Sequence, residues 1–303
     1  MQTQSLPSIS IKQTPQILFL GNGINRQFEQ GSWDDIINDY AVKNITGYKK
    51  GQFKDFPATM QIVMATGDKV DKSMVDLAKK FLECEITDEQ ICYNQKLLRL
   101  PFEHIITTNY SYELELAVGG GYSVGNYRKQ NFVTNCDIKN NNDMNLYQYT
   151  DVTFNEAKKH IWHIHGQLYK PKSIIMGHYY YGKLVSQIQN HIPHLMAKWN
   201  GCKTHDKNFN IKSWVDLFIF GDVHIIGFGM DLSETDIWWL ACCKKRNAPN
   251  AKIYFYTPDC DISKEKELLM KTYGIEIVKS RLKDRNYKKY YQDVLSKVKI
   301  KMK

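Results

Sequence analysis

The sequence predicts an α/β fold in which a mainly parallel sheet is flanked by helices. Short apolar runs alternate along the chain with longer segments of helical periodicity, and several of the runs end in glycine or polar residues. Strands of a parallel sheet are buried on both faces, and each needs a crossover to reach the next, which gives this pattern. The 303 residues are enough for one large domain or two modest ones.

Composition indicates a folded globular protein, with 43% hydrophobic and 13% aromatic residues. No apolar run approaches the ~20 residues that cross a bilayer. Residues 1–14 lack the apolar region of a secretory signal, so we expect a cytoplasmic protein without membrane contact. The seven cysteines contain no Cys-x-x-Cys pair, which argues against a disulfide framework and against a structural zinc site.

The first predicted strand begins at Ile17 and ends in Gly21-Asn22-Gly23. Two glycines one residue apart let the backbone turn sharply and approach a ligand. A helix that follows such a turn would direct its free N–H groups at a phosphate. Strand, turn and helix together form the first half of a Rossmann-like unit. The last glycine of the G-x-G-x-x-G dinucleotide-binding fingerprint is missing. A buried strand that simply ends in glycine is the alternative.

Helical patterns dominate the next segment. Ser32 has the features of an N-cap, residues 58–100 have helical periodicity, and residues 87–90 have the spacing of a capping box. We interpret residues 45–100, approximately, as a helical insertion in the first crossover of one domain that spans residues 15–285. Residues 1–14 are expected to be a tail, and residues 286–303 a basic helix and tail.

The rest of the chain repeats the alternation. Strands are predicted at 104–110, 160–166, 173–177, 223–229, 252–257 and 275–278, and helices at 112–118, 179–199, 233–240, 262–273 and after 286. Residues 125–155 are polar and asparagine-rich, so we expect them to be irregular.

Polar residues and glycines follow four of these strands. Since the carboxyl ends of parallel strands meet at one edge, residues 21–23, 107–109, 165–166 and 227–229 are expected to converge there. Asn109 could instead only cap the next helix, and His165 could be a structural turn residue. Histidine is nonetheless suited to proton transfer near neutral pH. Strand alternation would place His163 on the same face as His165.

The order of these four motifs resembles the sirtuin superfamily, and more closely the sirtuin-like (SIR2-like) NADase domains of bacterial anti-phage defence systems. The resemblance runs from about Ile17 to Thr257, and residues 106–110 and 163–166 are its most specific parts. It implies two sets of site residues. The catalytic residues would be Asn109 and His165, and the NAD-binding residues would be Gly21, Asn22, Gly23, Asn25, Thr108, Gly227 and Gly229.

Two departures from the protein-deacylating sirtuins favour NAD cleavage. Thr108 stands where those enzymes have glutamine and Ser111 where they have aspartate, and their four-cysteine zinc module has no counterpart. The resemblance therefore implies an NAD+ glycohydrolase that depletes cellular NAD+ in anti-phage defence (abortive infection), with NAD as substrate and no metal. It also implies a homo-oligomer or an ATPase or helicase partner, with nucleic acid contacted through that partner.

Two other functions stay open from the sequence. One is a catalytically inactive sensor or scaffold that binds NAD or ADP-ribose. The other is a nucleic-acid-binding effector that uses the basic C-terminus, because residues 264–303 hold 13 Lys/Arg against 5 Asp/Glu in a chain of net charge +9. Apolar residues recur every three or four positions from Tyr287 to Val298. We expect this helix to be a docking or assembly surface outside the catalytic site.

Overall fold

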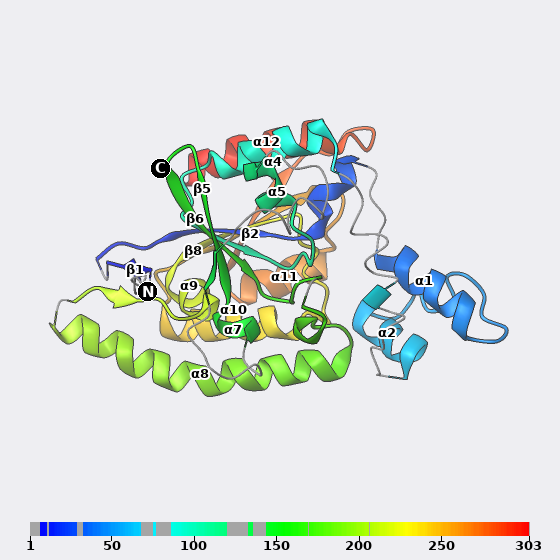
Figure 1. The fold of residues 1–303 in the computed structure, drawn as a ribbon, viewed down its shortest axis with the longest axis horizontal. Coiled ribbons are helices and arrows are strands. Elements are labelled where there is room, and N and C mark those ends of the chain that lie inside the picture. Colours follow the sequence, from blue (N-terminus) through cyan, green and yellow to red (C-terminus); the bar gives the residue numbers. More distant parts are fainter. Residues whose placement is uncertain are drawn as a thin grey trace.

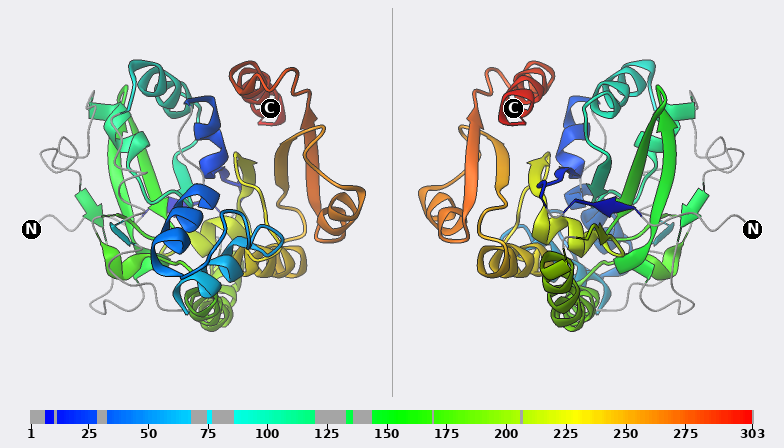
Figure 2. Two further views of the ribbon diagram at one scale, coloured as in Figure 1. Left: turned by 90° about the vertical axis from the view of Figure 1, so that its right-hand side faces the viewer. Right: turned by 90° about the vertical axis from the view of Figure 1, so that its left-hand side faces the viewer.

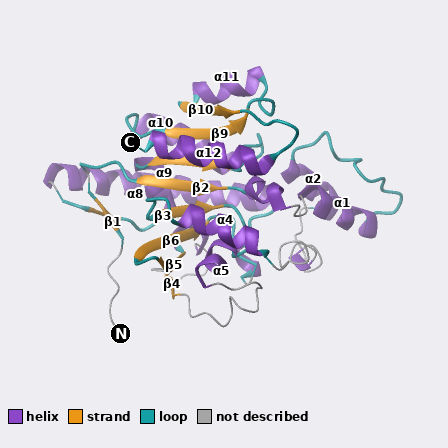
Figure 3. Ribbon diagram, turned by 90° about the horizontal axis from the view of Figure 1, so that it is seen from above, coloured by secondary structure: helices purple, strands orange, loops and turns teal. Residues whose placement is uncertain are grey.

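The computed structural model describes residues 7–10, 12–28, 33–67, 75–76, 86–119, 133–135, 144–168, 170–205 and 207–302. Its centre is an eight-stranded sheet with the order β10-β9-β8-β2-β3-β6-β5-β4 (Figure 3). These strands are β2 (Gln16–Leu20), β3 (His104–Thr107), β4 (Val133–Asn135), β5 (Tyr149–Phe154), β6 (Ala157–His163), β8 (Asp222–Ile226), β9 (Ile253–Pro258) and β10 (Ile275–Ser280).

The six strands from β10 to β6 run parallel, and β5 and β4 are antiparallel additions at one edge. The four strands whose carboxyl ends were predicted to converge are β2, β3, β6 and β8. They are neighbours in the sheet. The predicted α/β fold with a mainly parallel, Rossmann-like sheet is therefore confirmed.

Helices cover both faces of the sheet (Figures 1 and 2). One face is covered by α4 (Asp88–Leu98), α5 (Glu113–Gly119) and α12 (Tyr287–Lys301). The other is covered by α8 (His178–His205), α9 (Trp214–Phe220), α10 (Thr235–Asn247) and α11 (Lys264–Thr272). Two separate hydrophobic cores result, because successive strand residues point to opposite faces: Ile105 packs in the first core and Ile106 in the second.

The chain reverses its direction of travel across the sheet between β2 and β8. It moves from β2 to β3 and β6 on one side, and then returns through α8 and α9 to β8, on the other side of β2. Loops after the two strands diverge at such a switch point, and ligands of open α/β sheets bind there. A ligand site is therefore expected at the turns that follow β2 and β8.

The expected helical insertion divides into two parts. Helices α1 (Trp33–Asn44) and α2 (Ala58–Thr66) pack on each other and lie beyond the carboxyl ends of the strands, whereas α4 belongs to the layer on the sheet (Figure 1). Thr87 caps α4, as predicted, by accepting a hydrogen bond from the Gln90 N–H at 3.2 Å. Ser32 lies outside the described residues.

Three local expectations were wrong. Residues 125–155 were expected to be irregular, but the described part contains β4, α7 (Met144–Tyr147) and β5. Residues 173–177 do not form a strand, because a 3-10 turn η3 (Pro171–Ser173) precedes them. The expected N-terminal tail, residues 1–14, contains β1 (Ser8–Ile9), which pairs with β7 (Phe209–Asn210).

The basic C-terminal helix α12 packs its apolar side on the sheet. Tyr290, Tyr291, Val294 and Val298 are buried in the first core. Several of its lysines pair with acids instead of standing free: Lys288 with Glu89, Lys297 with Asp293, and Lys301 with Glu276. These ion pairs reduce the charge available to a nucleic acid. Among the described helices, none combines the length and apolar character needed to span a membrane.

Candidate functional site

The turns after β2 and β8 are held together by their backbones. The N–H of Gly21 donates to the carbonyl of Ile226 at 2.9 Å, and that of Gly23 to the carbonyl of Gly227 at 2.6 Å. A Cβ on Gly21 or Gly23 would come within 2.6 Å of the Gly227 oxygen. These glycines therefore permit the close approach of two turns, and their N–H groups are already satisfied.

A short 3-10 helix, η1 (Asn22–Phe28), follows β2 where an α-helix was considered. Its buried Asn25 joins a polar network that connects η1 to α4 and α5. The Asn25 amide donates to Asn22 Oδ1 at 2.8 Å and to Glu113 Oε1 at 3.3 Å, and Gln90 donates to Asn25 Oδ1 at 3.4 Å. Asn25 is thus fixed from three sides, which makes its orientation well defined.

A cavity of about 280 Å³, here called the central cavity, opens at the carboxyl ends of the strands. Seven of the nine predicted site residues bear on it. Its wall includes Asn22, Gly23, Asn25, Thr108, His165, Gly227 and Gly229. Helix α2 and the N-terminal part of α8 close other sides of the cavity through Ile62 and Tyr181.

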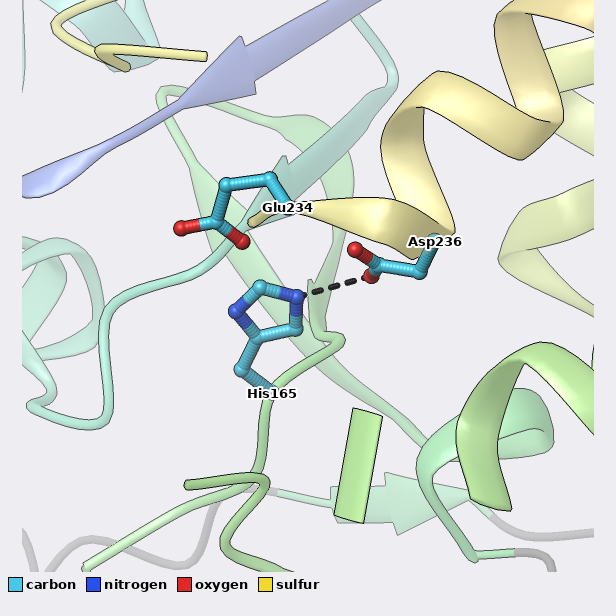
Figure 4. A group of neighbouring side chains, drawn as sticks. All are labelled: His165, Glu234 and Asp236. Atoms are coloured by element: carbon cyan, nitrogen blue, oxygen red, sulfur yellow. Dashed lines mark hydrogen bonds and ion pairs between the residues drawn. The ribbon is translucent and has the colours of Figure 1, made fainter. Parts of the chain in front are cut away.

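His165 lies beside two acidic residues at the start of α10, Glu234 and Asp236 (Figure 4), and beside Tyr181 of α8. Its Nε2 donates to Asp236 Oδ2 at 2.9 Å, and its Nδ1 lies 3.4 Å from the hydroxyl of Tyr181. The same hydroxyl donates to Glu234 Oε2 at 2.9 Å. Because the Tyr181 proton is directed at Glu234, the hydroxyl oxygen can accept a hydrogen bond from Nδ1 once the His165 ring is protonated.

Electrostatics shift the proton affinities of this group. Burial lowers the pKa of His165, but the Asp236 carboxylate outweighs it, and the pKa lies above its ordinary value. Burial, which outweighs the attraction of His165, raises the pKa of Glu234 to about 7. Glu234 therefore titrates near neutral pH, directly beside a histidine whose pKa is raised, and such a pair suits proton transfer.

His163 lies on the opposite side of the sheet from His165, so the expectation that they share a face was wrong. Its Nε2 pairs with Glu115 Oε1 of α5 at 2.9 Å, whereas His165 faces α10. The physical reason is a turn directly after β6, in which the N–H of Gly166 bonds to the His163 carbonyl at 3.2 Å. Strict alternation ends where the strand ends.

Asn109 is not part of the wall of the central cavity. It lies in a small cavity of about 10 Å³ with Glu113, Glu115 and His163, and Asn25 lines both cavities. Its carbonyl bonds to His163 Nδ1 at 2.7 Å, and its Oδ1 is buried without a partner among the described residues. A buried amide oxygen without a partner costs about 1–3 kcal/mol, so a ligand hydroxyl would be a favourable addition here.

A second cavity of about 330 Å³ adjoins the central one and shares with it Gly23, Arg26 and residues 227–229. We call it the tyrosine cavity, because Tyr287, Tyr290 and Tyr291 of α12 line it. The guanidinium of Arg26 lies 5.9 Å from the centre of the Tyr287 ring. Helix α12 was expected to lie outside the catalytic site, and its first two turns line this adjoining cavity, not the described wall of the central cavity that contains His165.

Several residues around His165 and the cavities were not predicted from the sequence. Asp236 lies within the stretch that resembles the sirtuin superfamily but was given no role, and Glu234, Tyr181 and Arg26 were not predicted as site residues. Only the fold brings α8 and α10 to His165. His165, Glu234 and Asp236 each offer one atom within 4.8 Å of the others, a set that could hold a metal ion. The absence of a metal stays a prediction.

The fold and the cavity define the class of protein: a Rossmann-like α/β protein with a cavity at the carboxyl ends of its parallel strands, where ligands of such sheets bind. A family model described as a SIR2-like domain matches residues 103–278, more than half of the chain. The chain therefore belongs to the SIR2-like domain family. The match includes Asn109, His165 and Asp236, and begins after the Gly21–Asn25 turn. A search of the curated proteins finds no match to this chain.

Proposed function

We propose that the protein is an NAD+ glycohydrolase that cleaves the bond between nicotinamide and ribose. The observation that carries this proposal is His165, which is buried in the wall of the central cavity and hydrogen-bonded through Nε2 to Asp236. A histidine held by a carboxylate in this way is suited to general base catalysis. Membership of the SIR2-like family supports NAD as the substrate.

The two adjoining cavities suit the two halves of a dinucleotide. The nicotinamide ribose would occupy the central cavity near His165, and the adenosine would occupy the tyrosine cavity. The diphosphate would then cross the shared wall, where Arg26 is the cation available to it. Since the N–H groups of Gly21 and Gly23 bond to Ile226 and Gly227, the side chains of Arg26 and Asn22 would supply more of the phosphate contacts than these amides.

The reaction needs one proton acceptor. Water attacks the anomeric carbon of the ribose, the bond to nicotinamide breaks with its electron pair, and nicotinamide leaves as a neutral molecule. The positive charge that builds on the ribose resembles that in glycoside hydrolysis. With Nε2–H donated to Asp236, Nδ1 of His165 is the ring nitrogen left to accept the proton of the water. Asn109 would orient a ribose hydroxyl or the water once its side chain turns toward the ligand.

The two departures from the protein-deacylating sirtuins support glycohydrolysis over deacylation. Thr108 lines the central cavity, and the sequence has no Cys-x-x-Cys pair for the zinc module of the deacylases. We also propose that the activity depletes cellular NAD+ in anti-phage defence, in a homo-oligomer or with an ATPase or helicase partner. These roles rest on the resemblance of the motifs around Thr108, His165 and Gly227.

The test is nicotinamide release by the purified protein, with His165→Ala and Asn109→Ala as variants. We expect each to lose ~10²-fold or more in turnover while the thermal unfolding transition stays cooperative. His205→Ala, an exposed histidine at the end of α8, is the control and should keep full activity. A folded His165→Ala protein that releases nicotinamide as fast as the wild type would contradict the proposal. Absence of turnover in the wild type, with NAD binding intact, would favour the inactive sensor instead.

A further inference from the structure

A third cavity lies along α8, away from the central cavity, and has a volume of about 500 Å³. Helix α8 supplies one wall through residues that recur every three or four positions: Gln187, Asn190, His191, His194, Leu195 and Lys198. The other walls come from α7, from β7 and from the start of α9. We call it the basic cavity. Its volume is in the range of sites for small organic ligands.

The charges of the basic cavity are predominantly positive. Lys198 and Lys212 are exposed at its rim, and within the described part of the chain neither ammonium group has an ion-pair or hydrogen-bond partner. The acid among the described residues of the wall, Asp216, is buried, and both of its carboxylate oxygens already accept hydrogen bonds. Its Oδ1 bonds to His191 Nε2 at 2.6 Å, and its Oδ2 accepts the backbone N–H of Lys212 at 2.8 Å.

The floor of the cavity is ordered before any ligand binds. His191 is fixed from both ring nitrogens, since Nδ1 lies 3.2 Å from the hydroxyl of Tyr147 and Nε2 binds Asp216. Apolar surface is provided by Leu146, Leu195 and Phe209, all of which are otherwise buried in the second core. A pre-ordered floor lowers the entropy cost of binding.

We propose that the basic cavity binds a small organic phosphate, with the phosphate at Lys198 and Lys212 and the apolar part against Leu195 and Phe209. Two unpaired cations match a dianion, and the buried Asp216 directs its oxygens at His191 and at the backbone N–H of Lys212. An uncharged ligand of the same size would leave both ammonium groups without a partner, so the anion is preferred.

This site is connected to His165 by hydrogen bonds. Asn145, two residues before Tyr147, donates through its side-chain amide to the carbonyl of Ser173. Two residues later, the N–H of Ile175 donates to the carbonyl of His165 at 2.8 Å. A ligand that shifts α7 would therefore act on the segment that lines the central cavity with Ile175 and Met176.

Helix α8 is a second connection between the two sites. Tyr181, which contacts His165 and Glu234, and His191, which contacts Asp216, lie on this one helix. Ten residues of helix span about 15 Å. The basic cavity is thus a regulatory site for the central one. The site itself does not depend on the proposed function, but an effect on nicotinamide release does.

The first test is calorimetric titration of the full chain with phenyl phosphate. We expect saturable binding of one molecule per chain, weakened by about tenfold or more in a Lys198→Gln/Lys212→Gln variant because two charge-assisted contacts are lost. The matched control, Lys183→Gln/Lys207→Gln, removes the same charge from exposed lysines outside the cavity and should bind like the wild type. Phenol, which lacks the phosphate, should bind far more weakly.

The second test is hydrogen exchange with saturating phenyl phosphate, which needs no enzymatic turnover. We expect slower exchange of the amides of residues 173–176 in the wild type, and no change in the Lys198→Gln/Lys212→Gln variant. If phenyl phosphate does not bind saturably, or if both double variants lose affinity equally, the proposed phosphate site in the basic cavity is wrong. Binding without a change at residues 173–176 would overturn the connection to His165. Either result leaves the proposed NAD+ cleavage untouched.

Discussion

Asp236 holds His165 through a 2.9 Å hydrogen bond between Oδ2 and Nε2, and both side chains are buried. The other oxygen, Asp236 Oδ1, is buried without a partner among the described residues. Among the described residues, the carboxylate thus has His165 as its hydrogen-bond partner, and its charge acts mainly on that ring. We infer that Asp236 is a positioning residue, which sets both the orientation and the proton affinity of the candidate base.

The first prediction concerns the pH dependence of an Asp236→Asn variant. The base must be unprotonated to accept a proton, so the activity of the wild type should rise with pH through the pKa of His165, which Asp236 holds above its ordinary value. Asparagine removes the attraction for the protonated ring and leaves burial, which lowers the pKa. The acid limb of the kcat/KM profile should therefore move to lower pH.

The maximal turnover of Asp236→Asn should fall at the same time, because the amide no longer fixes the ring. Asp293→Asn, an exposed acid of α12, is the control and should leave the profile in place. A merely structural role of Asp236 would lower the amount of folded protein without moving the acid limb. Rate profiles per folded protein, with the folded fraction measured by thermal unfolding, separate the two.

The second prediction compares two glycines of one turn. Gly227 has a φ of +66°, and a Cβ there would come within 2.6 Å of the Ile24 nitrogen. Gly229 has no neighbour within 4 Å of the same position. Gly227→Ala should cost ~1–3 kcal/mol of folding free energy, or more with the clash, whereas Gly229→Ala should be close to neutral. Denaturant unfolding of both variants checks this, and equal stabilities would contradict the account of the paired turns.

Much of the fold could be predicted because its strands are short apolar runs. The residues from Ile17 to Leu20 and from Val223 to Ile226 are all buried, as strands at the centre of a parallel sheet must be. Because parallel strands bring their carboxyl ends to one edge of the sheet, the convergence of residues after these strands could also be predicted. Thr108, His165, Gly227 and Gly229 line one cavity.

The antiparallel edge was missed for a local reason. Strands β5 and β6 are joined by Asn155 and Glu156, both of which have positive φ, and Phe154 pairs with Ala157. A two-residue turn of this kind usually carries glycine, so an Asn-Glu pair gives no clear signal of a hairpin. Helix α9 was missed because it is buried all round, so that no polar face marks its period.

The partners of His165 could not be predicted because they depend on distances between elements. Asp236 is 71 residues from His165 along the chain, and only the packing of α10 against the end of β6 brings them together. The position of Asn109 depends in the same way on a distant residue, since its carbonyl bonds to His163, 54 residues further along the chain.

The third prediction concerns Tyr287 in the tyrosine cavity. Loss of its ring in Tyr287→Leu removes the contact with Arg26 and part of the wall expected to hold adenosine. We expect the KM for NAD to rise by about fivefold with kcat nearly unchanged, because the adenosine lies far from the broken bond. Tyr287→Phe keeps the ring and should behave like the wild type. A loss confined to kcat would contradict this placement of the adenosine.

The last prediction concerns the end of α12 and the expected assembly surface. Truncation after Val298 removes the ion pair between Lys301 and Glu276 and the exposed Ile300, but leaves the buried Tyr290, Tyr291 and Val294 in place. A surface ion pair contributes ~0–1 kcal/mol, so the truncated chain should still fold, and its tyrosine cavity should still bind NAD. If this end of the helix docks a second copy or another protein, the particle mass from light scattering should fall, or activation should fail, while NAD binding survives. An unchanged mass with unchanged activation would rule out the docking role, since only the helix end was altered. Loss of NAD binding in a chain that still unfolds cooperatively would instead show that residues 299–303 support the tyrosine cavity.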